Sequence, residues 1–437
     1  MPPASSHPTP RGQTMAEKLL SRAAGLKAHA GDLVICEPAM AMGTDGSVPM
    51  ALDYLRDMQM DEPLPAPARL SQIVFALDHY GVASGERALA LQAKARGYAR
   101  MHGVRVFDVA EGIGHQLMLE TGLVLPGQLV VGADSHAVTY GALNAFGSGI
   151  GSSDLAGILQ CAQVWLKVPE SIRIHLTGKL PPYASAKDLA LTMARELGVG
   201  GANYMALEFD GPGVASLDMD DRIVLANMSV EMGAKAGIFP YDACTGAWLA
   251  GRSDMPFEPA LADPDAHYAQ TLSFDLDAVV PLVALPHRVD NVVDFHAADA
   301  ARIDMVYLGT CTGGRIKDYR EALAVLRAGG GVARGVRLIV TPASAAIHAE
   351  MEATGMLDEF AALGAEFQPP GCGSCCGTCG AIPADGEHVM STANRNFQGR
   401  MGNRHAQIFL ASPRACATAA VTGRLTDPRD TRNPPAA

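Results

Sequence analysis

The sequence has few aromatic residues, no excess of basic charge and no long uninterrupted hydrophobic run. Aromatic residues make up only 5% of the 437 residues, whereas hydrophobic residues make up 48%. This balance fits an α/β enzyme better than an aromatic-rich β-sandwich or a disordered chain. The formal net charge of −12 argues against a general attraction to nucleic acid or to an anionic membrane. An anionic substrate would therefore have to be held by local arginines or by a metal.

Segments typical of membrane spans and secretion signals are also missing. The apolar runs, such as residues 278–286, are broken by proline or charge well before the roughly 18 residues that a membrane-spanning helix needs. Residues 1–14 have no apolar core of the kind found in a secretory signal, and we predict a disordered tail there. Nine cysteines in such a chain favour a reducing compartment, where clustered thiols are usually ligands or catalysts. The predicted location is the cytoplasm, with no membrane association.

Strand-like and helical segments alternate along the chain. Strands are expected at residues 33–36, 71–78, 104–109, 128–131, 171–176, 304–308 and 336–340, and helices at 15–29, 86–101, 186–197, 318–328 and 343–353. This rhythm predicts an α/β fold with mainly parallel sheets. We divide the chain into α/β domains at 15–168, 169–295 and 296–426, followed by a mobile tail at 427–437.

Acidic and histidine side chains follow several of the predicted strands. Asp78 and His79 end one strand, His115 follows a Gly-Ile-Gly turn, and Asp134 and His136 follow another strand. A single histidine is most often a satisfied core residue. Three histidines at three strand ends, two of them near an aspartate, instead indicate a site for proton transfer.

Three cysteines have a spacing that suits a metal centre with an open coordination position. Cys311 directly follows a predicted strand, and Cys372 and Cys375 lie two residues apart in a glycine-rich turn. Three thiolates leave one metal position free, whereas a closed site has four ligands. The alternative is a structural zinc knuckle of Cys372, Cys375, Cys376 and Cys379, with Cys311 as a core thiol. Zinc fits this spacing poorly, because the adjacent Cys375 and Cys376 cannot easily point at one metal.

A polar segment at residues 391–400 contains two arginines, Arg395 and Arg400. Guanidinium groups bind carboxylates through two parallel hydrogen bonds, so this segment would suit a dicarboxylic substrate. A solvated surface loop is the alternative interpretation of the same residues.

Taken together, these motifs resemble those of the aconitase superfamily. The resemblance is carried by Asp78-His79, Gly112-Ile-Gly-His-Gln116, Gly132-Ala-Asp-Ser-His136, Glu208-Phe-Asp-Gly-Pro-Gly213, Thr310-Cys-Thr312, Gly371-Cys-Gly-Ser-Cys375 and Asn394-Arg-Asn-Phe-Gln-Gly-Arg400. Their order and approximate spacing agree from about Met15 to Arg424. The length is similar to that of the separate large subunits of 3-isopropylmalate dehydratase and homoaconitase-like enzymes, whereas single-chain aconitases are far longer.

The resemblance implies three doubly wound α/β/α domains packed around a [4Fe-4S] cluster, without the family's swivel domain. Cys311, Cys372 and Cys375 would hold the cluster, and one iron without a cysteine ligand would act as a Lewis acid on the substrate hydroxyl.

The same correspondence assigns catalytic roles to six residues. His79 paired with Asp78, and His136 paired with Asp134, would protonate the departing hydroxyl and orient water at the iron. His115 and Glu208 would lie near the same oxygens.

The resemblance also implies a substrate and a partner. Ser135, Asn394, Arg395 and Arg400 would bind a small di- or tricarboxylic acid. The family's catalytic base is a serine on the swivel domain, so we expect a separate small subunit of that type, in a heterodimer or a heterotetramer.

The chain departs from the family pattern at a few positions. Gly313 replaces the usual asparagine after the Cys-Thr pair, and Thr44 stands where relatives commonly have histidine or glutamine. Both changes remove an expected polar contact near the cluster or the substrate. Cys376 and Cys379 are additional thiols beside the ligand Cys375.

The expected activity is that of a hydro-lyase, a carbon–oxygen lyase that removes and re-adds water. Isomerisation of 3-isopropylmalate and 2-isopropylmalate, a step of leucine biosynthesis, comes first, followed by homoaconitase-, citramalate- or dimethylmalate-type dehydration. A hypothesis of another class is a non-catalytic protein whose cluster senses iron or redox state. Gly313 and Thr44 favour that hypothesis, whereas the retained Asp–His pairs, Arg395 and Arg400 weaken it.

Overall fold

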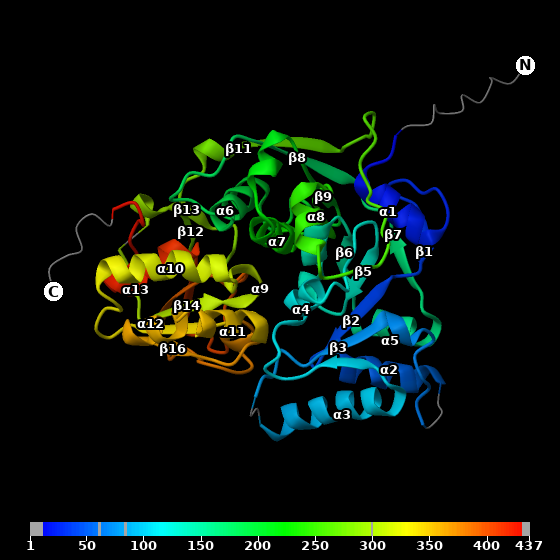
Figure 1. Ribbon diagram of the computed structural model, residues 1–437, viewed down its shortest axis with the longest axis horizontal. Coiled ribbons are helices and arrows are strands. Elements are labelled where there is room, and N and C mark those ends of the chain that lie inside the picture. Colours follow the sequence, from blue (N-terminus) through cyan, green and yellow to red (C-terminus); the bar gives the residue numbers. More distant parts are fainter. Residues whose placement is uncertain (1–11, 60–62, 83–84, 299, 431–437) are drawn as a thin grey trace, which may run out of the picture.

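The computed structural model describes residues 12–59, 63–82, 85–298 and 300–430, which fold around three large sheets and one two-stranded sheet (Figure 1). The first sheet has five parallel strands in the order β4-β3-β2-β5-β6. Their bounds are β2 (Met40–Thr44), β3 (Ile73–Ala76), β4 (Arg105–Phe107), β5 (Leu129–Gly132) and β6 (Phe146–Gly149). The carboxyl ends of these parallel strands therefore lie at one edge of the sheet.

Both faces of the first sheet are buried, which explains why its strands are apolar at nearly every position. Successive side chains of a strand point to opposite faces. Met42 and Val74 accordingly join the core shared with the second sheet, while Ala41 and Phe75 join the core beneath the helices. Those helices are α2 (Val48–Gln59), α3 (Glu86–His102) and α5 (Ser152–Cys161), on one side of the sheet (Figure 1).

The second sheet has four parallel strands in the order β10-β9-β8-β11. Their bounds are β8 (Ser171–Thr177), β9 (Ala206–Asp210), β10 (Ala236–Ile238) and β11 (Gln270–Asp275). Helix α6 (Ala186–Leu197) has the bounds that the sequence predicts. It begins at a capping box in which Ser185 and Asp188 exchange hydrogen bonds with each other's backbone.

The third sheet has seven strands in the order β13-β12-β18-β17-β14-β15-β16. Their bounds are β12 (Leu282–Ala284), β13 (Val292–Asp294), β14 (Met305–Gly309), β15 (Arg337–Thr341), β16 (Ala365–Phe367), β17 (His388–Ser391) and β18 (Gln407–Leu410). Helices lie on both faces: α10 (Ile316–Gly329) and α13 (Pro413–Thr422) on one, α11 (Ala345–Ala353) and α12 (Met356–Ala362) on the other (Figure 1).

The predicted boundary between the second and third domains differs from the sheets that the structure contains. Strands β12 and β13 lie in the region assigned to the second domain, yet they belong to the third sheet. Ala284 of β12 pairs antiparallel with Leu410 of β18, and Val283 is buried in the core of the third sheet. A short apolar segment gives no indication of which sheet edge it extends, so the sequence placed it with its preceding neighbours.

Several residues that the sequence analysis assigned to the tails belong to the packed structure. Residues 1–11 and 431–437 lie outside the described residues. Thr14, assigned to the disordered tail, is buried and caps the first turn of α1 (Met15–Ala24). Asp427, assigned to the mobile tail, is only 3% exposed and pairs with Arg429 and His296. Residues 12–14 and 427–430 are therefore part of the packed structure.

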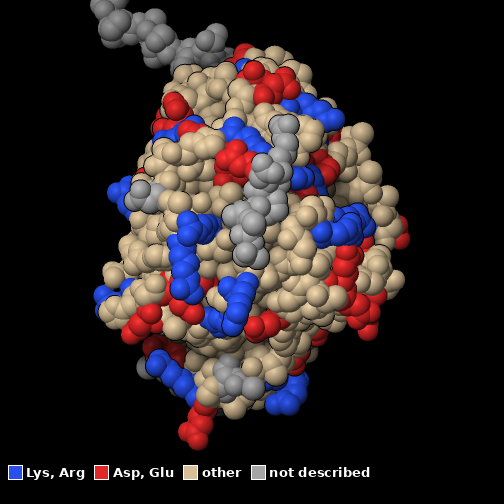
Figure 2. Space-filling model, turned by 90° about the vertical axis from the view of Figure 1, so that its left-hand side faces the viewer, with Lys and Arg blue, Asp and Glu red and all other residues tan. Residues whose placement is uncertain are grey.

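The surface carries charges of both signs. On the face shown in Figure 2, Lys and Arg side chains are interspersed with Asp and Glu side chains. Among the described helices, none is both long and apolar enough to span a lipid bilayer.

Candidate active site

The strand ends of the first sheet bring the predicted acidic and histidine side chains together around Asp134, just beyond β5. The carboxylate of Asp134 accepts a hydrogen bond from His115 Nε2 at 2.9 Å and lies 3.3 Å from His79 Nε2. It also accepts the backbone N–H of His136 at 2.8 Å. His115 reaches this position because it lies in the first turn of α4 (Gly114–Glu120). Three segments of the first domain thus meet at one carboxylate.

The carboxylates and histidine rings of this network stabilise each other's charged forms. Burial alone would raise the pKa of Asp134, but hydrogen bonds from the three histidines hold it well below its ordinary value. Burial disfavours a charged His79, but Asp78 and Asp134 on its two sides raise its pKa well above the ordinary value. The two carboxylates therefore favour the imidazolium form of His79.

Asp78 connects this network to the cysteines. Its Oδ1 atom accepts from His79 Nδ1 at 2.8 Å and its Oδ2 atom accepts from the N–H of Gly114 at 2.8 Å. The same Oδ2 atom lies 3.9 Å from Cys372 Sγ, and the Asp78 carbonyl accepts the N–H of Cys372 at 3.1 Å. Asp78 is therefore one of the residues through which the first and third domains contact each other.

The main partner of His136 is Glu231, which the sequence analysis did not select. His136 Nε2 lies 2.9 Å from Glu231 Oε1, whereas its Nδ1 atom is 3.4 Å from Asp134. Glu231 belongs to the short helix η4 (Ser229–Met232) and also accepts from Arg395 Nε at 3.0 Å. Burial raises its pKa, but His136 and Arg395 outweigh burial and lower it. The one available signal was a lone carboxylate among apolar residues.

The structure does not bring Glu208 to this site. Its carboxylate accepts the backbone N–H groups of Met15 and Ala16 at 3.0 and 2.8 Å, the hydroxyl of Ser171 at 2.9 Å and that of Tyr268 at 3.0 Å. These donors belong to the start of α1 and to the second domain. A carboxylate is stabilised at a helix N-terminus, where N–H groups lack intrahelical partners. The expectation that Glu208 lies near the reacting oxygens is therefore wrong. The Glu208 carboxylate instead binds the N-terminus of α1.

Two of the three predicted ligand cysteines, Cys311 and Cys375, are linked through a polar side chain, that of Asn394. Cys311 follows β14, and its Sγ atom receives the amides of Asn227 at 3.1 Å and Asn394 at 3.3 Å. Asn394 Oδ1 lies 3.7 Å from Cys375 Sγ, which also receives Arg400 Nη2 at 3.5 Å. Asn227 was not predicted, whereas Asn394 and Arg400 were. Amide and guanidinium donors directed at sulfur are suited to thiolates rather than thiols.

The thiols of Cys311, Cys372 and Cys375 fit a multi-metal cluster better than a single ion. Tetrahedral zinc with Zn–S bonds of about 2.3 Å would hold its sulfurs roughly 3.8 Å apart. The three cysteines do not form one of the groups of ligand atoms that all lie within 4.8 Å of one another. Burial and the nearby Cys375 raise the pKa of Cys311 to about 12, and burial, Asp78 and the other thiols raise that of Cys372. A bound metal group would favour the thiolate forms of these thiols.

The zinc-knuckle alternative is not supported by the side-chain directions. Cys375 is directed at Asn394 and Arg400, whereas the adjacent Cys376 lies 3.3 Å from the carbonyl of His79. In the part of the chain that the structure describes, no compact group of metal-binding atoms includes Cys376 or Cys379.

The two departures from the family pattern have local explanations. A Cβ atom on Gly313 would lie 2.7 Å from the Cβ atom of Thr392, so a larger residue cannot fit there without displacing Thr392. Thr44 is buried, and its Oγ1 atom lies 3.1 Å from Ser47 Oγ in the turn before α2.

Asp45, also missed by the sequence analysis, holds the His79 loop in place. Its carboxylate accepts the backbone N–H groups of His79 at 3.0 Å and Tyr80 at 3.2 Å, and the Gln92 amide at 3.0 Å. Asp45 therefore fixes the backbone from which the His79 side chain extends.

The predicted substrate-binding residues have different surroundings. Arg395 is paired with Glu231, whereas the buried Nε atom of Arg400 has no hydrogen-bond acceptor among the described residues. Asn394 contacts two cysteines, as described above. Ser135 begins the 3₁₀ helix η2 (Ser135–Leu143), directly after Asp134.

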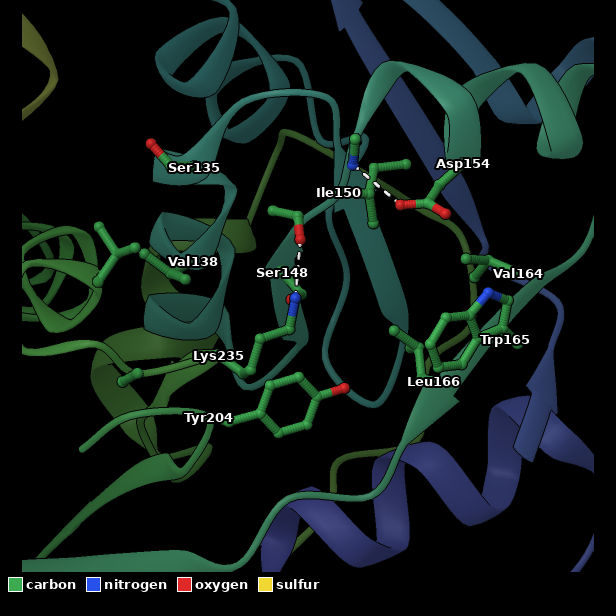
Figure 3. Close-up of a pocket in the computed structure, with 14 residues that line it drawn as sticks. Ser135, Val138, Ser148, Ile150, Asp154, Val164, Trp165, Leu166, Tyr204 and Lys235 are labelled. Carbon is green, nitrogen blue, oxygen red and sulfur yellow. Dashed lines mark hydrogen bonds between the residues drawn. The ribbon is translucent and has the colours of Figure 1, made fainter. Parts of the chain in front are cut away.

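A cleft of about 400 Å³ shares only Ser135 with the predicted site residues (Figure 3). Its wall includes Val138, Trp165 and Tyr204, and Trp165 comes from β7 (Val164–Lys167), which pairs with β1 (Leu33–Cys36). Lys235 also lines it, and its Nζ atom donates to the Gly149 carbonyl at 2.9 Å. The cleft contains none of the cysteines or histidines, so it is a neighbouring groove.

An α/β protein in which an Asp–His network faces three cysteines has the architecture of an iron–sulfur hydro-lyase. The model of the aconitase family (aconitate hydratase) matches residues 17–302 and 296–423, and the chain belongs to this family. It is accordingly a dehydratase of the aconitase type, which confirms the predicted enzyme class.

Curated relatives cover nearly the whole chain. The chain is 42% identical over 422 residues to 3-isopropylmalate dehydratase large subunit 1 of Thermotoga maritima, covering 96% of this chain and 99% of that protein. It is also 42% identical over 421 residues to the homoaconitase large subunit of Thermus thermophilus, covering 96% and 98%. Aconitase X of Thermococcus kodakaraensis has a similar fold, with a TM-score of 0.50 at 13% identity over 83% of this chain and 84% of that one. The predicted fold class is confirmed.

Proposed function

We propose that this chain is the large subunit of a [4Fe-4S]-dependent dehydratase that interconverts 3-isopropylmalate and 2-isopropylmalate by removing and re-adding water. The reaction type follows from the family. The substrate is inferred from the relatives named as 3-isopropylmalate dehydratase large subunits. A specific observation favours a second candidate, homocitrate-type dehydration, because the relative named homoaconitase large subunit is equally similar at 42% identity.

The observation that carries this proposal is the position of Asp78. One of its carboxylate oxygens is 2.8 Å from His79 and the other is 3.9 Å from Cys372 Sγ. A group that can transfer a proton therefore lies next to a thiol of the expected cluster. A purely structural cluster would not need such a neighbour.

Cys311, Cys372 and Cys375 would hold the cluster, leaving one iron without a cysteine ligand. That iron would supply Lewis-acid chemistry toward the substrate hydroxyl. The amides of Asn227 and Asn394 and the guanidinium of Arg400 donate toward the cysteine sulfurs, and such donors stabilise negative charge on sulfur.

His79 would supply the proton that the leaving hydroxyl needs. Asp78 and Asp134 flank the ring and raise its pKa, which favours the imidazolium form that a proton donor needs. His115 and His136 would orient water through their own links to Asp134 and Glu231. The carboxylates of the network thus stabilise the positive charge of the protonated His79 ring.

Arg400 is the best placed of the predicted residues to bind a substrate carboxylate. Its Nε atom is buried without an acceptor among the described residues, and a buried unpaired donor is costly unless a ligand satisfies it. Asn394, Arg395 and Ser135 would complete the contacts. A di- or tricarboxylate would thus be neutralised locally in a chain of net charge −12.

A separate small subunit would supply the base that removes the carbon-bound proton. The relatives that match over 98 to 99% of their own length are named large subunits, so they have small partners. We infer a swivel-domain partner for this chain in a heterodimer or a heterotetramer.

The test combines the anaerobically reconstituted chain with a small subunit from the same source. The reactants are 3-isopropylmalate, homocitrate, citramalate and 2,3-dimethylmalate, and formation of the unsaturated acid is followed by ultraviolet absorbance. Turnover of 3-isopropylmalate at the highest kcat/KM supports the proposal. Preference for homocitrate would favour the second candidate, and a loaded cluster without turnover of any of these acids would favour the sensing hypothesis.

A further inference from the structure

Two thiols next to the site, Cys376 and Cys379, take no part in the network or in the expected cluster. Cys376 Sγ lies 3.3 Å and Cys379 Sγ 3.4 Å from the carbonyl oxygen of His79. The same sulfurs lie 3.4 and 3.6 Å from the carbonyl of Gly373. Both thiols therefore lie beside the same two oxygen atoms and close to each other.

The local backbone keeps this pair together and accessible. Gly377 and Gly380 have φ angles of +69° and +80°, which L-residues rarely adopt, so the chain can reverse direction around the pair. Cys376 and Cys379 are partly exposed and Thr378 between them is exposed, whereas Cys375 is buried. A small reagent can thus reach the pair without reaching Cys375, whereas Cys372 is partly exposed like the pair.

We propose that Cys376 and Cys379 form an oxidisable dithiol site that exchanges with low-molecular-weight disulfides of the glutathione type. One thiolate attacks the incoming disulfide, forms a mixed disulfide and releases one small thiol. The second thiolate then displaces the other small thiol and closes the Cys376–Cys379 bond. The protein loses two protons and two electrons, and the small disulfide takes them up to become two small thiols.

The pair is placed to act on His79. The backbone N–H of His79 is held by Asp45 at 3.0 Å, and its carbonyl is the shared acceptor of both thiols and of the Thr378 hydroxyl. A disulfide has no S–H group, so oxidation removes the thiol donors from this carbonyl. The loop that carries His79 would then be less restrained. An effect of this change on turnover rests on the proposed function, whereas the thiol exchange does not.

The experiment uses the reconstituted, cluster-loaded chain with the exposed Cys161 replaced by serine to remove background exchange. After anaerobic incubation with glutathione disulfide, peptide mass spectrometry should find Cys376 linked to Cys379 and the protein lighter by two hydrogen atoms. Dithiothreitol should reverse the change. The variants Cys376→Ser and Cys379→Ser should instead retain one glutathione, because no second thiol displaces it. No reaction at these two residues, or a bond that includes Cys372 or Cys375, would overturn the proposal.

A second readout tests the effect on His79 without relying on activity. Amide hydrogen exchange of residues 78–82 should be faster after oxidation of the wild-type chain and unchanged in the Cys376→Ser/Cys379→Ser double variant. Unchanged exchange despite a complete disulfide would refute the effect on the loop. If the proposed reaction fails with every acid, both readouts remain measurable, so the two failures are distinguishable.

Discussion

At the scale of single residues, the position of His79 is fixed from several sides. Asp78 and Asp134 hold its ring, Asp45 holds its N–H, and the segment around Thr378 holds its carbonyl. Such positioning lets a proton donor act without first paying for reorganisation. The role proposed for His79 leads to a prediction with a matched control.

Replacing His79 with alanine should reduce kcat by about 10²- to 10⁴-fold, the usual contribution of a general acid, while the iron content stays unchanged. His175 is a suitable control because its Nδ1 atom lies 2.8 Å from Asp210, the same distance as in the His79–Asp78 pair. The control His175→Ala should keep its turnover. Full activity of His79→Ala would remove His79 from the mechanism.

Glu231 and Glu208 provide a second contrast, because both are buried but only Glu231 contacts the network. Glu231→Gln keeps the shape but removes the charge that faces His136 and Arg395. We expect kcat to fall at least about tenfold with the cluster retained. Glu208→Gln should lower the unfolding temperature but leave turnover per folded molecule unchanged. If steady-state assays showed that Glu208→Gln loses turnover and Glu231→Gln keeps it, Glu208 would belong to the site instead.

The sequence could predict residues that lie in motifs but not those that act across domains. Asp78, His79, Asp134 and the cysteines follow strands, where parallel α/β sheets collect functional groups. Glu231 and Asn227 lie in apolar helical segments without such a motif, and their role depends on which domain packs against them. Glu208 has the right chemistry, but its strand presents it to α1 rather than to the site.

At the scale of elements, local signals determine helices better than sheet edges. The capping box at Ser185 and Asp188 defines the start of α6, because its hydrogen bonds lie within four residues of each other. Strand β12 has three residues and pairs with β18, which lies more than a hundred residues later in the chain. No local pattern contains that information.

The buried carboxyl of Asp188 makes the stability of this element depend on pH. Burial raises its pKa to about 6, against about 3.9 for an unfolded aspartate. The folded state thus keeps the proton to a higher pH, so stability falls as pH rises from about 4 to 6, by about 3 kcal/mol, and is constant above that. The unfolding temperature of Asp188→Asn minus that of the wild type should therefore increase from pH 4 to 6. A difference that is constant or decreases over this range would contradict the assignment.

At the scale of the whole molecule, the three sheets meet at the site. The first contributes the Asp–His network, the second contributes Asn227 and Glu231, and the third contributes the cysteines. A core shared between the first and second sheets fixes their relative position. In the proposed mechanism, the described residues would supply the proton donor of the reaction.

We expect the chain alone to give little or no turnover, because the base that removes the carbon-bound proton would come from the small subunit. Activity at a fixed concentration of the chain should rise with added small subunit and reach a plateau. Full activity of the chain alone would show that it contains its own base.

The most direct test of the account is the iron content of the anaerobically reconstituted chain, with the paramagnetic resonance spectrum before and after mild oxidation. The account predicts a [4Fe-4S] cluster that loses one iron and gives a [3Fe-4S] signal, and no cluster in Cys372→Ser. Bound zinc, or a cluster that cannot lose one iron, would contradict the open coordination site on which the proposed reaction depends.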